Sequence, residues 1–283
     1  MNKADRVSLT ILPFLLVVVF LFALAGSWGG ASLFAWLVGL ALLVQWLAFI
    51  PAFLLQTEKF YDITGSITYI SVVTLGLILS PQRDARAVLL WALVLVWALR
   101  LGSFLFGRIH KAGRDDRFDE IKPLFFRFLL TWTLQGMWVA FTVSPALVAI
   151  TSPVRAGLDV FALLGGLLWL AGFAIEVTAD MQKSKFNAQP ANKGRFINTG
   201  LWSRSRHPNY FGEIVLWLGI MVIALPVLRG WQWVTLISPL FVTLLLTRVS
   251  GIPLLEKKAE SKWGGQEDYE AYKKNTPVLI PKL

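Results

Sequence analysis

The stretch GRFINTGLWSRSRHPNYFGE, residues Gly194–Glu213, joins two strongly hydrophobic parts of the chain. It brings together three arginines and a histidine: Arg195, Arg204, Arg206 and His207. Pro208 fixes φ near the helical value and lacks the N–H that a first helical residue leaves unpaired, so it predicts a helix start. We expect His207 to be the N-cap of that helix. A helix N-terminus surrounded by cations favours an anion.

The sequence on both sides of this stretch has the composition of a membrane protein. Hydrophobic residues make up 56% of the 283 residues, and 13 residues are tryptophan. A water-soluble domain of this composition would have too little polar surface. We predict an all-α fold, a polytopic transmembrane helical bundle of about seven or eight helices. The expected segments are residues 9–26, 31–55, 66–80, 86–107, 127–150, 158–179, 209–228 and 231–250.

The distribution of basic residues predicts the topology. With eight spans, 23 of the 27 Lys and Arg residues lie on the side that carries both termini. The four exceptions are Arg83, Arg86, Arg155 and Arg229. The positive-inside rule therefore predicts cytoplasmic N- and C-termini, and we expect the bacterial inner membrane. Seven helices with a re-entrant piece remain an alternative for the later loops.

The polar connections give further expectations. Aromatic residues are dense among the cations of residues 181–207, so we expect an ordered polar loop there. Residues 253–263 are apolar on one side and charged on the other, which predicts an amphipathic helix at the membrane surface. We expect one integral membrane domain over residues 1–283, with residues 1–150 forming much of the substrate side and 158–283 the cofactor half.

Composition also excludes several function classes. The chain has no cysteine, so thiol catalysis and thiolate metal sites are excluded. Two histidines are too few for a His-based metal site, and we expect no metal. No glycine-rich loop has Rossmann or P-loop spacing. We expect no nucleic acid partner, because membrane topology already accounts for the position of the basic residues.

The pattern R-x-I-x-x-G-L-W-x-x-x-R-H-P-N-Y-x-G-E, which ends at Glu213, resembles the C-terminal signature of membrane steroid 5α-reductases and sterol reductases. A looser version occurs in isoprenylcysteine methyltransferases, and Glu256 resembles that group. The likeness covers about Glu176 to Pro281, and Thr57–Ser66 is also similar. The chain looks most like the bacterial branch of the 5α-reductase-like family.

This resemblance implies a membrane reductase that uses NADPH to saturate a carbon–carbon double bond of a lipophilic enone or sterol-like substrate. Two alternatives remain open. One is a methyltransferase that uses S-adenosylmethionine, and the other is a non-catalytic lipid-binding protein. The many cations near residue 207 favour a ligand with several phosphates, since arginine pairs strongly with phosphate. We therefore favour the reductase, with a substrate that enters from the bilayer, membrane lipids as neighbours and an unknown oligomeric state.

The resemblance also implies residue roles. Asp180 and Asn209 would hold ribose or nicotinamide groups, arginines the phosphates, and Glu213 would orient the nicotinamide end. Arg195 is our choice for the 2′-phosphate. The candidate cofactor-binding residues are Asp180, Lys185, Asn187, Arg195, Arg204, His207, Asn209, Tyr210, Glu213 and Arg248.

The candidate catalytic residues are Glu58 and Tyr61, with Tyr69 as an alternative phenol. In the 5α-reductases a Gln-Glu pair and a tyrosine assist hydride addition, and Gln56-Thr57-Glu58 is the nearest match. A carboxyl group in apolar surroundings can keep its proton near neutral pH and donate it. An interfacial belt of polar and aromatic residues explains the same stretch without chemistry.

Overall fold

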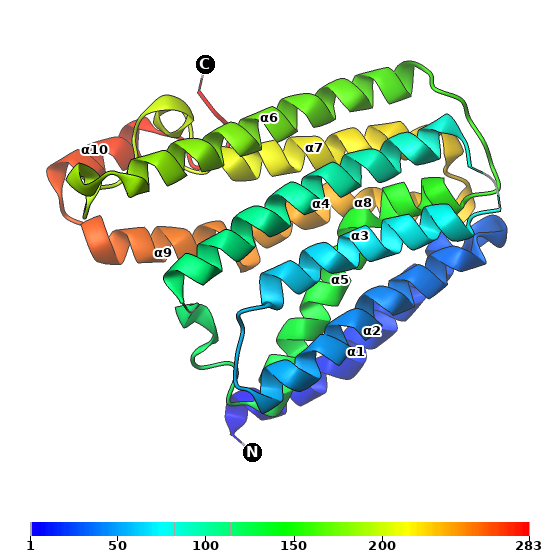
Figure 1. Cartoon of the computed structure of the whole chain (residues 1–283), viewed down its shortest axis with the longest axis horizontal. Helices are drawn as coiled ribbons and strands as arrows, with labels where there is room; N and C mark the ends of the chain where they lie inside the picture. Colours follow the sequence, from blue (N-terminus) through cyan, green and yellow to red (C-terminus); the bar gives the residue numbers. More distant parts are fainter. Residues whose placement is uncertain (1, 82, 114, 283) are drawn as a thin grey trace. The chain divides into compact units, whose positions relative to one another are not determined.

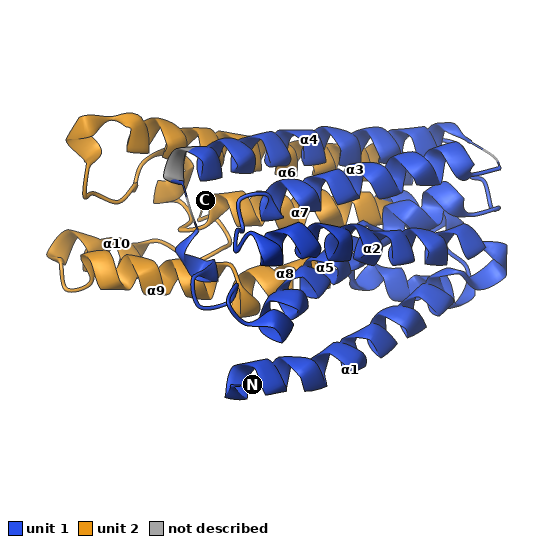
Figure 2. Ribbon diagram, turned by 60° about the horizontal axis from the view of Figure 1, so that its bottom comes forward, with its two compact units in different colours: residues 1–162, 223–238 blue, residues 163–222, 239–283 orange. Residues whose placement is uncertain are grey.

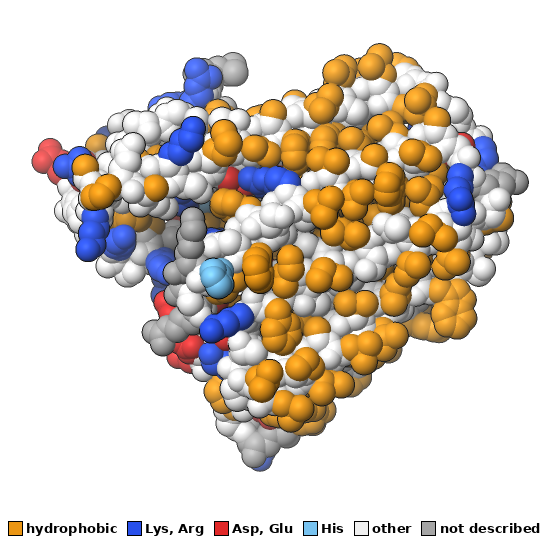
Figure 3. All heavy atoms as spheres, in the orientation of Figure 1, with side chains coloured by type: hydrophobic (Ala, Val, Ile, Leu, Met, Phe, Trp, Pro, Cys, Tyr) orange, Lys and Arg blue, Asp and Glu red, His pale blue; other side chains and the backbone are white. Residues whose placement is uncertain are grey.

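The computed structural model describes residues 2–81, 83–113 and 115–282, and every regular element within them is helical. Eight helices there are long and apolar enough to cross a membrane. Figure 1 shows these helices along the chain, coloured from the N-terminus to the C-terminus. On the face shown in Figure 3, hydrophobic side chains cover much of the surface. These features confirm the all-α class and support a multi-pass integral membrane protein.

The helix bounds follow the predicted segments closely for most of the chain. The α-helices are α1 Lys3–Gly26, α2 Ser32–Leu54, α3 Tyr61–Leu79, α4 Ala85–Ala112, α5 Phe125–Thr151, α6 Val160–Ala188, α7 Pro208–Ala224, α8 Ile237–Leu244, α9 Ile252–Trp263 and α10 Glu267–Asn275. The start of α7 at Pro208 and the helix over 252–263 are as predicted.

Two expected boundaries beside polar connections are wrong. Helix α3 begins at Tyr61 rather than at residue 66, and Asp62 in its first turn suits the positive end of the helix dipole. Helix α6 continues to Ala188, so the first eight residues of the expected loop 181–207 are helical. After Gly172 the rest of α6 contains no proline or glycine, and Pro190 then disfavours the α conformation just before it.

The eighth segment is also less regular than predicted. It begins with a 3₁₀ helix, Gly230–Leu236, continues as α8, and ends with a π turn over Leu245–Val249. Pro239 lies in the first turn of α8, where its missing N–H costs no helical hydrogen bond. The predicted single α-helix over 231–250 is therefore wrong in detail, because the segment contains 3₁₀, α and π turns in succession.

The chain forms two compact units, coloured separately in Figure 2. Unit 1 comprises residues 1–162 and 223–238, and unit 2 comprises residues 163–222 and 239–283. In unit 1, α5 packs against α1, α2, α3 and α4. The unit includes a buried aromatic core in which Phe128 and Trp132 of α5 meet Phe49 and Ala52 of α2 and Phe118.

A buried arginine joins distant segments of unit 1. Arg86, in the first turn of α4, donates to the carbonyl groups of Ala156, Gly157 and Ile223. Its guanidinium also lies 2.8 Å from a carboxylate oxygen of Asp159. A buried cation with this many acceptors is fully compensated, so Arg86 holds the connection between α5 and α6 in place.

Helices α6 and α7 make backbone contact within unit 2 through glycines. A Cβ atom at Gly172 would lie 2.5 Å from the carbonyl oxygen of Gly212, and one at Gly219 would lie 2.5 Å from that of Gly165. Small residues allow this close approach of membrane helices. The contact fixes the register of the two helices that carry Glu176, Asp180 and Glu213.

Candidate functional site

The polar segment after α6 is folded onto that helix in unit 2. Gly200 has φ +60°, a left-handed conformation that favours glycine, and a Cβ there would collide with Gln182. The Gln182 amide oxygen accepts from Leu201 N–H at 2.9 Å, and the Trp202 indole donates to Ala179 O at 3.0 Å. Residues 189–207 therefore form an ordered connection, as predicted.

The last part of the chain supports the same segment. Arg206 N–H donates to Pro277 O at 2.9 Å, and Lys282 N–H donates to Arg204 O at 2.9 Å. Between them, the Ser205 hydroxyl donates to Leu279 O at 2.7 Å. These bonds fix the backbone immediately before His207.

Aromatic side chains anchor the other end of the segment. Phe196 contacts the rings of Trp263, Tyr269 and Tyr272, with centroid distances of 5.2–5.8 Å. The Trp263 indole also donates to Gly194 O at 2.6 Å. Helices α9 and α10 thus hold the segment that begins at Gly194, so α9 also anchors part of the candidate site.

The centre of the candidate site is a carboxylate that contacts both an arginine and a histidine. One Glu256 oxygen lies 2.7 Å from His207 Nε2, and the other lies 3.1 Å from an Arg206 terminal nitrogen. The imidazole is 5% exposed and stacks on Tyr210 at 5.7 Å between ring centroids. Two nitrogens remain buried without a hydrogen-bond partner among the described residues, His207 Nδ1 and Arg206 Nε.

The surroundings of His207 favour the neutral imidazole. Burial lowers the pKa of His207, and the nearby positive charges of Lys183 and Arg206 lower it further. The hydrogen bond and charge of Glu256 oppose this shift but do not reverse it. A neutral imidazole has one N–H donor and one lone pair, so it can offer an acceptor to a ligand.

Three candidate carboxylates lie inside unit 2. Glu176 and Asp180 are buried on α6, and Glu213 is buried on α7. A Cβ at Gly212 would lie 2.7 Å from Glu176 N, so the backbones carrying Glu176 and Glu213 touch. Glu176 and Asp180 are four residues apart in α6, so they lie on one face of this helix.

The remaining cofactor candidates of unit 2 are divided by exposure. Lys185, Asn187, Arg195, Arg204 and Arg248 are exposed, whereas Asn209 and Tyr210 are half-buried in the first turn of α7. Among the described residues, none of the four exposed cations has an ion-pair partner. Their charge is therefore available to an anion.

The catalytic candidate Glu58 belongs to unit 1 and has polar neighbours. Its carboxylate is 4% exposed, lies 3.0 Å from Lys122 Nζ and accepts from Asp115 N–H at 3.0 Å. The hydrogen bond to Glu58 raises the pKa of Lys122. The expectation that Glu58 faces apolar surroundings is wrong, because a cation and an N–H donor both contact its carboxylate.

The two tyrosine candidates differ in their contacts within unit 1. The Tyr61 hydroxyl donates to Thr131 O at 3.0 Å, and its ring lies edge-on to Phe118 and Trp132. Tyr69 is buried, with its ring edge-on to Trp97 at 5.0 Å between centroids. The proton of Tyr61 is thus engaged with the backbone of α5.

Sequence reasoning left Arg206, Glu256 and Gln45 out of the site residues. Arg206 stood in the quoted motif, and Glu256 stood out as a likeness to the methyltransferases, but nothing in the sequence pairs them. In unit 1, Gln45 donates to the Thr68 hydroxyl at 2.7 Å, while its amide oxygen is buried without a partner among the described residues. Gln135 donates to Tyr61 O at 3.1 Å, the interhelical bond expected of a lone glutamine.

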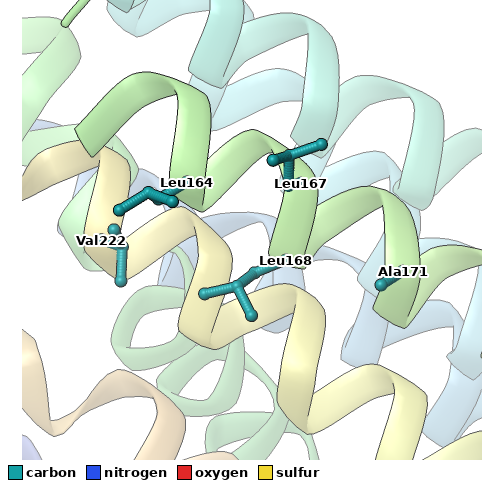
Figure 4. A pocket seen from close by; sticks show the side chains of 5 residues that line it. All are labelled: Leu164, Leu167, Leu168, Ala171 and Val222. Atoms are coloured by element: carbon teal, nitrogen blue, oxygen red, sulfur yellow. The ribbon is translucent and has the colours of Figure 1, made fainter. Parts of the chain in front are cut away.

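An apolar groove lies elsewhere in unit 2. It has a volume of about 430 Å³ and is lined by Leu164, Leu167, Leu168, Ala171 and Val222 (Figure 4). The lining has no group that could bind a nucleotide, so the groove suits hydrocarbon. No cluster of three or more His, Asp or Glu side chains within the described ranges could hold a metal ion.

Comparison with known proteins identifies the family. Residues 48–276 match the family model described as "Protein of unknown function (DUF1295)". The chain belongs to this family. No curated protein and no solved structure matches the chain. The matched range contains the Glu58 cluster and all the cofactor candidates.

Proposed function

We propose that this DUF1295 protein is a membrane oxidoreductase that uses NADPH to saturate a carbon–carbon double bond of a lipophilic enone or sterol-like substrate. One observation carries the proposal, namely the Arg206–Glu256–His207 cluster with its two buried, unsatisfied nitrogens. A buried polar atom without a partner costs free energy, and a polar ligand would supply the missing hydrogen bond. The resemblance to the 5α-reductase-like group supplies the reaction.

The residues present fit NADPH. Arg206 Nε–H is a donor for an anionic oxygen, and His207 Nδ1 is an acceptor for a hydroxyl or amide N–H. The exposed cations Arg195, Arg204 and Arg248 would hold the phosphates by charge-assisted hydrogen bonds. Glu176, Asp180 and Glu213 supply buried acceptors for ribose or carboxamide donors.

The reaction requires a hydride and a proton. The chemistry supplied by NADPH is a hydride for one carbon of the double bond, and the other carbon takes a proton. The proposed proton donors of this chain are Tyr61 and Tyr69, and Tyr61 would have to leave its hydrogen bond to Thr131 O to act. Glu58 is the weaker choice, because its charge is already paired with Lys122.

Charge favours this reading over a methyltransferase. S-adenosylmethionine carries no phosphate, whereas NADPH has a pyrophosphate and a 2′-phosphate. Exposed cations without ion-pair partners among the described residues suit the second ligand and would repel a sulfonium. Glu256 is the feature that favours the methyltransferase, and the following experiment separates the two functions.

Thermal unfolding of the detergent-solubilised protein tests the proposal. A ligand that binds only the folded state stabilises it by about 2.7 kcal/mol at a hundredfold excess over its dissociation constant. NADPH should raise the unfolding temperature, and S-adenosylmethionine should not. Stabilisation by S-adenosylmethionine alone would assign the protein to the methyltransferases.

We also propose that both termini and the segment after α6 face the cytoplasm of a bacterial inner membrane. The supporting observation is the one-sided distribution of Lys and Arg among the loops. Reporter fusions at residue 283 and near Asn192 should give cytoplasmic signals. An extracytoplasmic signal at either position would contradict the eight-span topology.

A further inference from the structure

From the contacts of Glu256 we infer that this residue is a positioning residue: it holds His207 in the tautomer with the proton on Nε2 and so presents the Nδ1 lone pair to a hydroxyl or amide N–H of the nucleotide. This inference deepens the proposed function and rests on it for the identity of the ligand. It concerns Glu256 and Arg206, which the sequence motif alone does not connect.

The direction of the hydrogen bond between His207 and Glu256 determines the tautomer of the imidazole. A carboxylate only accepts, so the 2.7 Å contact between Glu256 and His207 Nε2 requires a proton on that nitrogen. The other carboxylate oxygen faces Arg206 at 3.1 Å, which keeps the carboxylate ionised and in place. The environment thus selects the tautomer, as second-layer carboxylates do for histidine elsewhere.

The groups around the His207 imidazole determine its charge. His207 is 5% exposed, and two cations, Lys183 and Arg206, act on it against the single carboxylate Glu256. Burial and these cations favour the neutral ring. In the neutral ring with its proton on Nε2, Nδ1 is an acceptor and not a donor.

His207 Nδ1 is available to accept a hydrogen bond from a ligand. This nitrogen is buried and has no donor among the described residues. Stacking on Tyr210 and the Glu256 contact restrict rotation of the ring, so Nδ1 keeps a fixed direction. The neighbouring Arg206 Nε–H is a second buried atom without a partner, and it is a donor. A ribose phosphate offers both a hydroxyl donor and an anionic acceptor, which matches this pair.

Nitrogen-15 NMR of histidine-labelled protein in lipid tests the tautomer. The chain has two histidines, and a His110→Gln variant assigns the signals because His110 is exposed. We expect Nε2 of His207 to be protonated and Nδ1 to be unprotonated at neutral pH. On saturation with NADPH the Nδ1 signal should move in the direction of an accepted hydrogen bond.

A matched pair of variants tests the positioning role. Glu256→Gln keeps an oxygen and adds an NH₂ donor, so Nε2–H is no longer enforced and the Arg206 ion pair is lost. NADPH affinity should fall about tenfold, the equivalent of one weakened charged contact. Glu260→Gln on the same helix removes the contact with Lys273 only and should leave the affinity unchanged.

The outcomes separate this inference from the proposed function. A protonated Nδ1, an imidazolium at neutral pH, or an Nδ1 signal that NADPH leaves in place while still raising the unfolding temperature would overturn the inference and leave the reductase proposal standing. Equal affinities for NADPH in the Glu256→Gln and Glu260→Gln variants would overturn it as well. If NADPH fails to stabilise the wild-type protein, the reductase proposal fails, and the ligand assigned to Nδ1 fails with it.

Discussion

Two polar clusters of this chain use similar residues in different ways. In unit 1, Glu58 is paired with Lys122 and accepts a backbone N–H, so its hydrogen-bonding capacity is used within the protein. In unit 2, Glu256 is likewise paired, but the side chains that it holds keep two buried nitrogens unsatisfied. A cluster whose donors and acceptors are all paired within the protein stabilises the fold. A cluster with unpaired buried donors and acceptors can still bind a ligand, so the Glu256 cluster is the better ligand site.

The largest predicted effect follows from removing the Glu58 charge. Glu58→Gln leaves Lys122 without its buried partner, and such a loss typically costs about 3–5 kcal/mol. We expect the lower end, because Lys122 is partly exposed. Chemical denaturation in detergent would measure the change. Asp119→Asn is the control, since that exposed carboxylate also contacts Lys122, at 3.4 Å.

A double variant sharpens the same test. Lys122→Met should recover part of the stability lost in Glu58→Gln, because it removes the unpaired cation. If Glu58→Gln instead keeps full stability but loses turnover, Glu58 acts on the substrate and the distinction between the two clusters disappears.

The second prediction concerns the exposed cations of unit 2. Arg195→Ala should weaken NADPH binding by tens-fold, since a charge-assisted phosphate contact contributes about 1.5–3 kcal/mol. NADH affinity should hardly change, because NADH lacks the 2′-phosphate. Titration of both nucleotides measures this, and Lys274→Ala, an exposed cation on α10, is the control. Equal losses for both nucleotides would place Arg195 at the pyrophosphate instead.

The third prediction tests how the second cluster is built. A Cβ at Gly212 would lie 2.6 Å from Gly172 O, so Gly212→Ala should destabilise the protein by about 1–3 kcal/mol through overpacking. Because the same contact sets the register of Glu176 and Glu213, NADPH binding should weaken as well. Gly166→Ala, which has open space around its Cβ, should be neutral in both measurements. Unchanged NADPH affinity in Gly212→Ala would separate these carboxylates from the site.

The smallest predicted effect is on the pH dependence of stability. The folded state lowers the pKa of His207 below its ordinary value of 6.5, so the unfolded chain binds the proton more readily. The stability that this group contributes is complete above that value and is lost as the pH falls below it. Unfolding temperatures at neutral and mildly acidic pH should therefore differ less in His207→Gln than in His110→Gln. A wild-type slope retained in His207→Gln would refute this.

The fold could be predicted well because a long apolar segment in a bilayer forms a helix, which pairs all of its own backbone groups. The signals that failed were short ones. Tyr61–Gly65 reads as polar, yet it starts α3, because Thr64 bonds back to Phe60 O and Gln135 of α5 bonds Tyr61 O. The second of these contacts joins segments far apart in sequence and has no local signature.

The sequence could predict several residues of the site, but not which of their side chains contact one another. The motif placed His207 immediately before a helix, and α7 begins at Pro208 as expected. Nothing in the sequence could show that Glu256, about fifty residues later, would bond both His207 and Arg206. Likewise Lys122 was one cation among many, and only the folded chain shows it against Glu58.

The discontinuity of unit 1 has a consequence for biogenesis. The unit needs residues 223–238, which the ribosome makes after α6 and α7. Until then Arg86 lacks the Ile223 carbonyl, Ser144 lacks Thr235 O and Trp28 O lacks its Gln232 donor. Chains emerge from the N-terminus first. Unit 1 therefore gains these last hydrogen bonds only after residues 163–222 of unit 2 have been made.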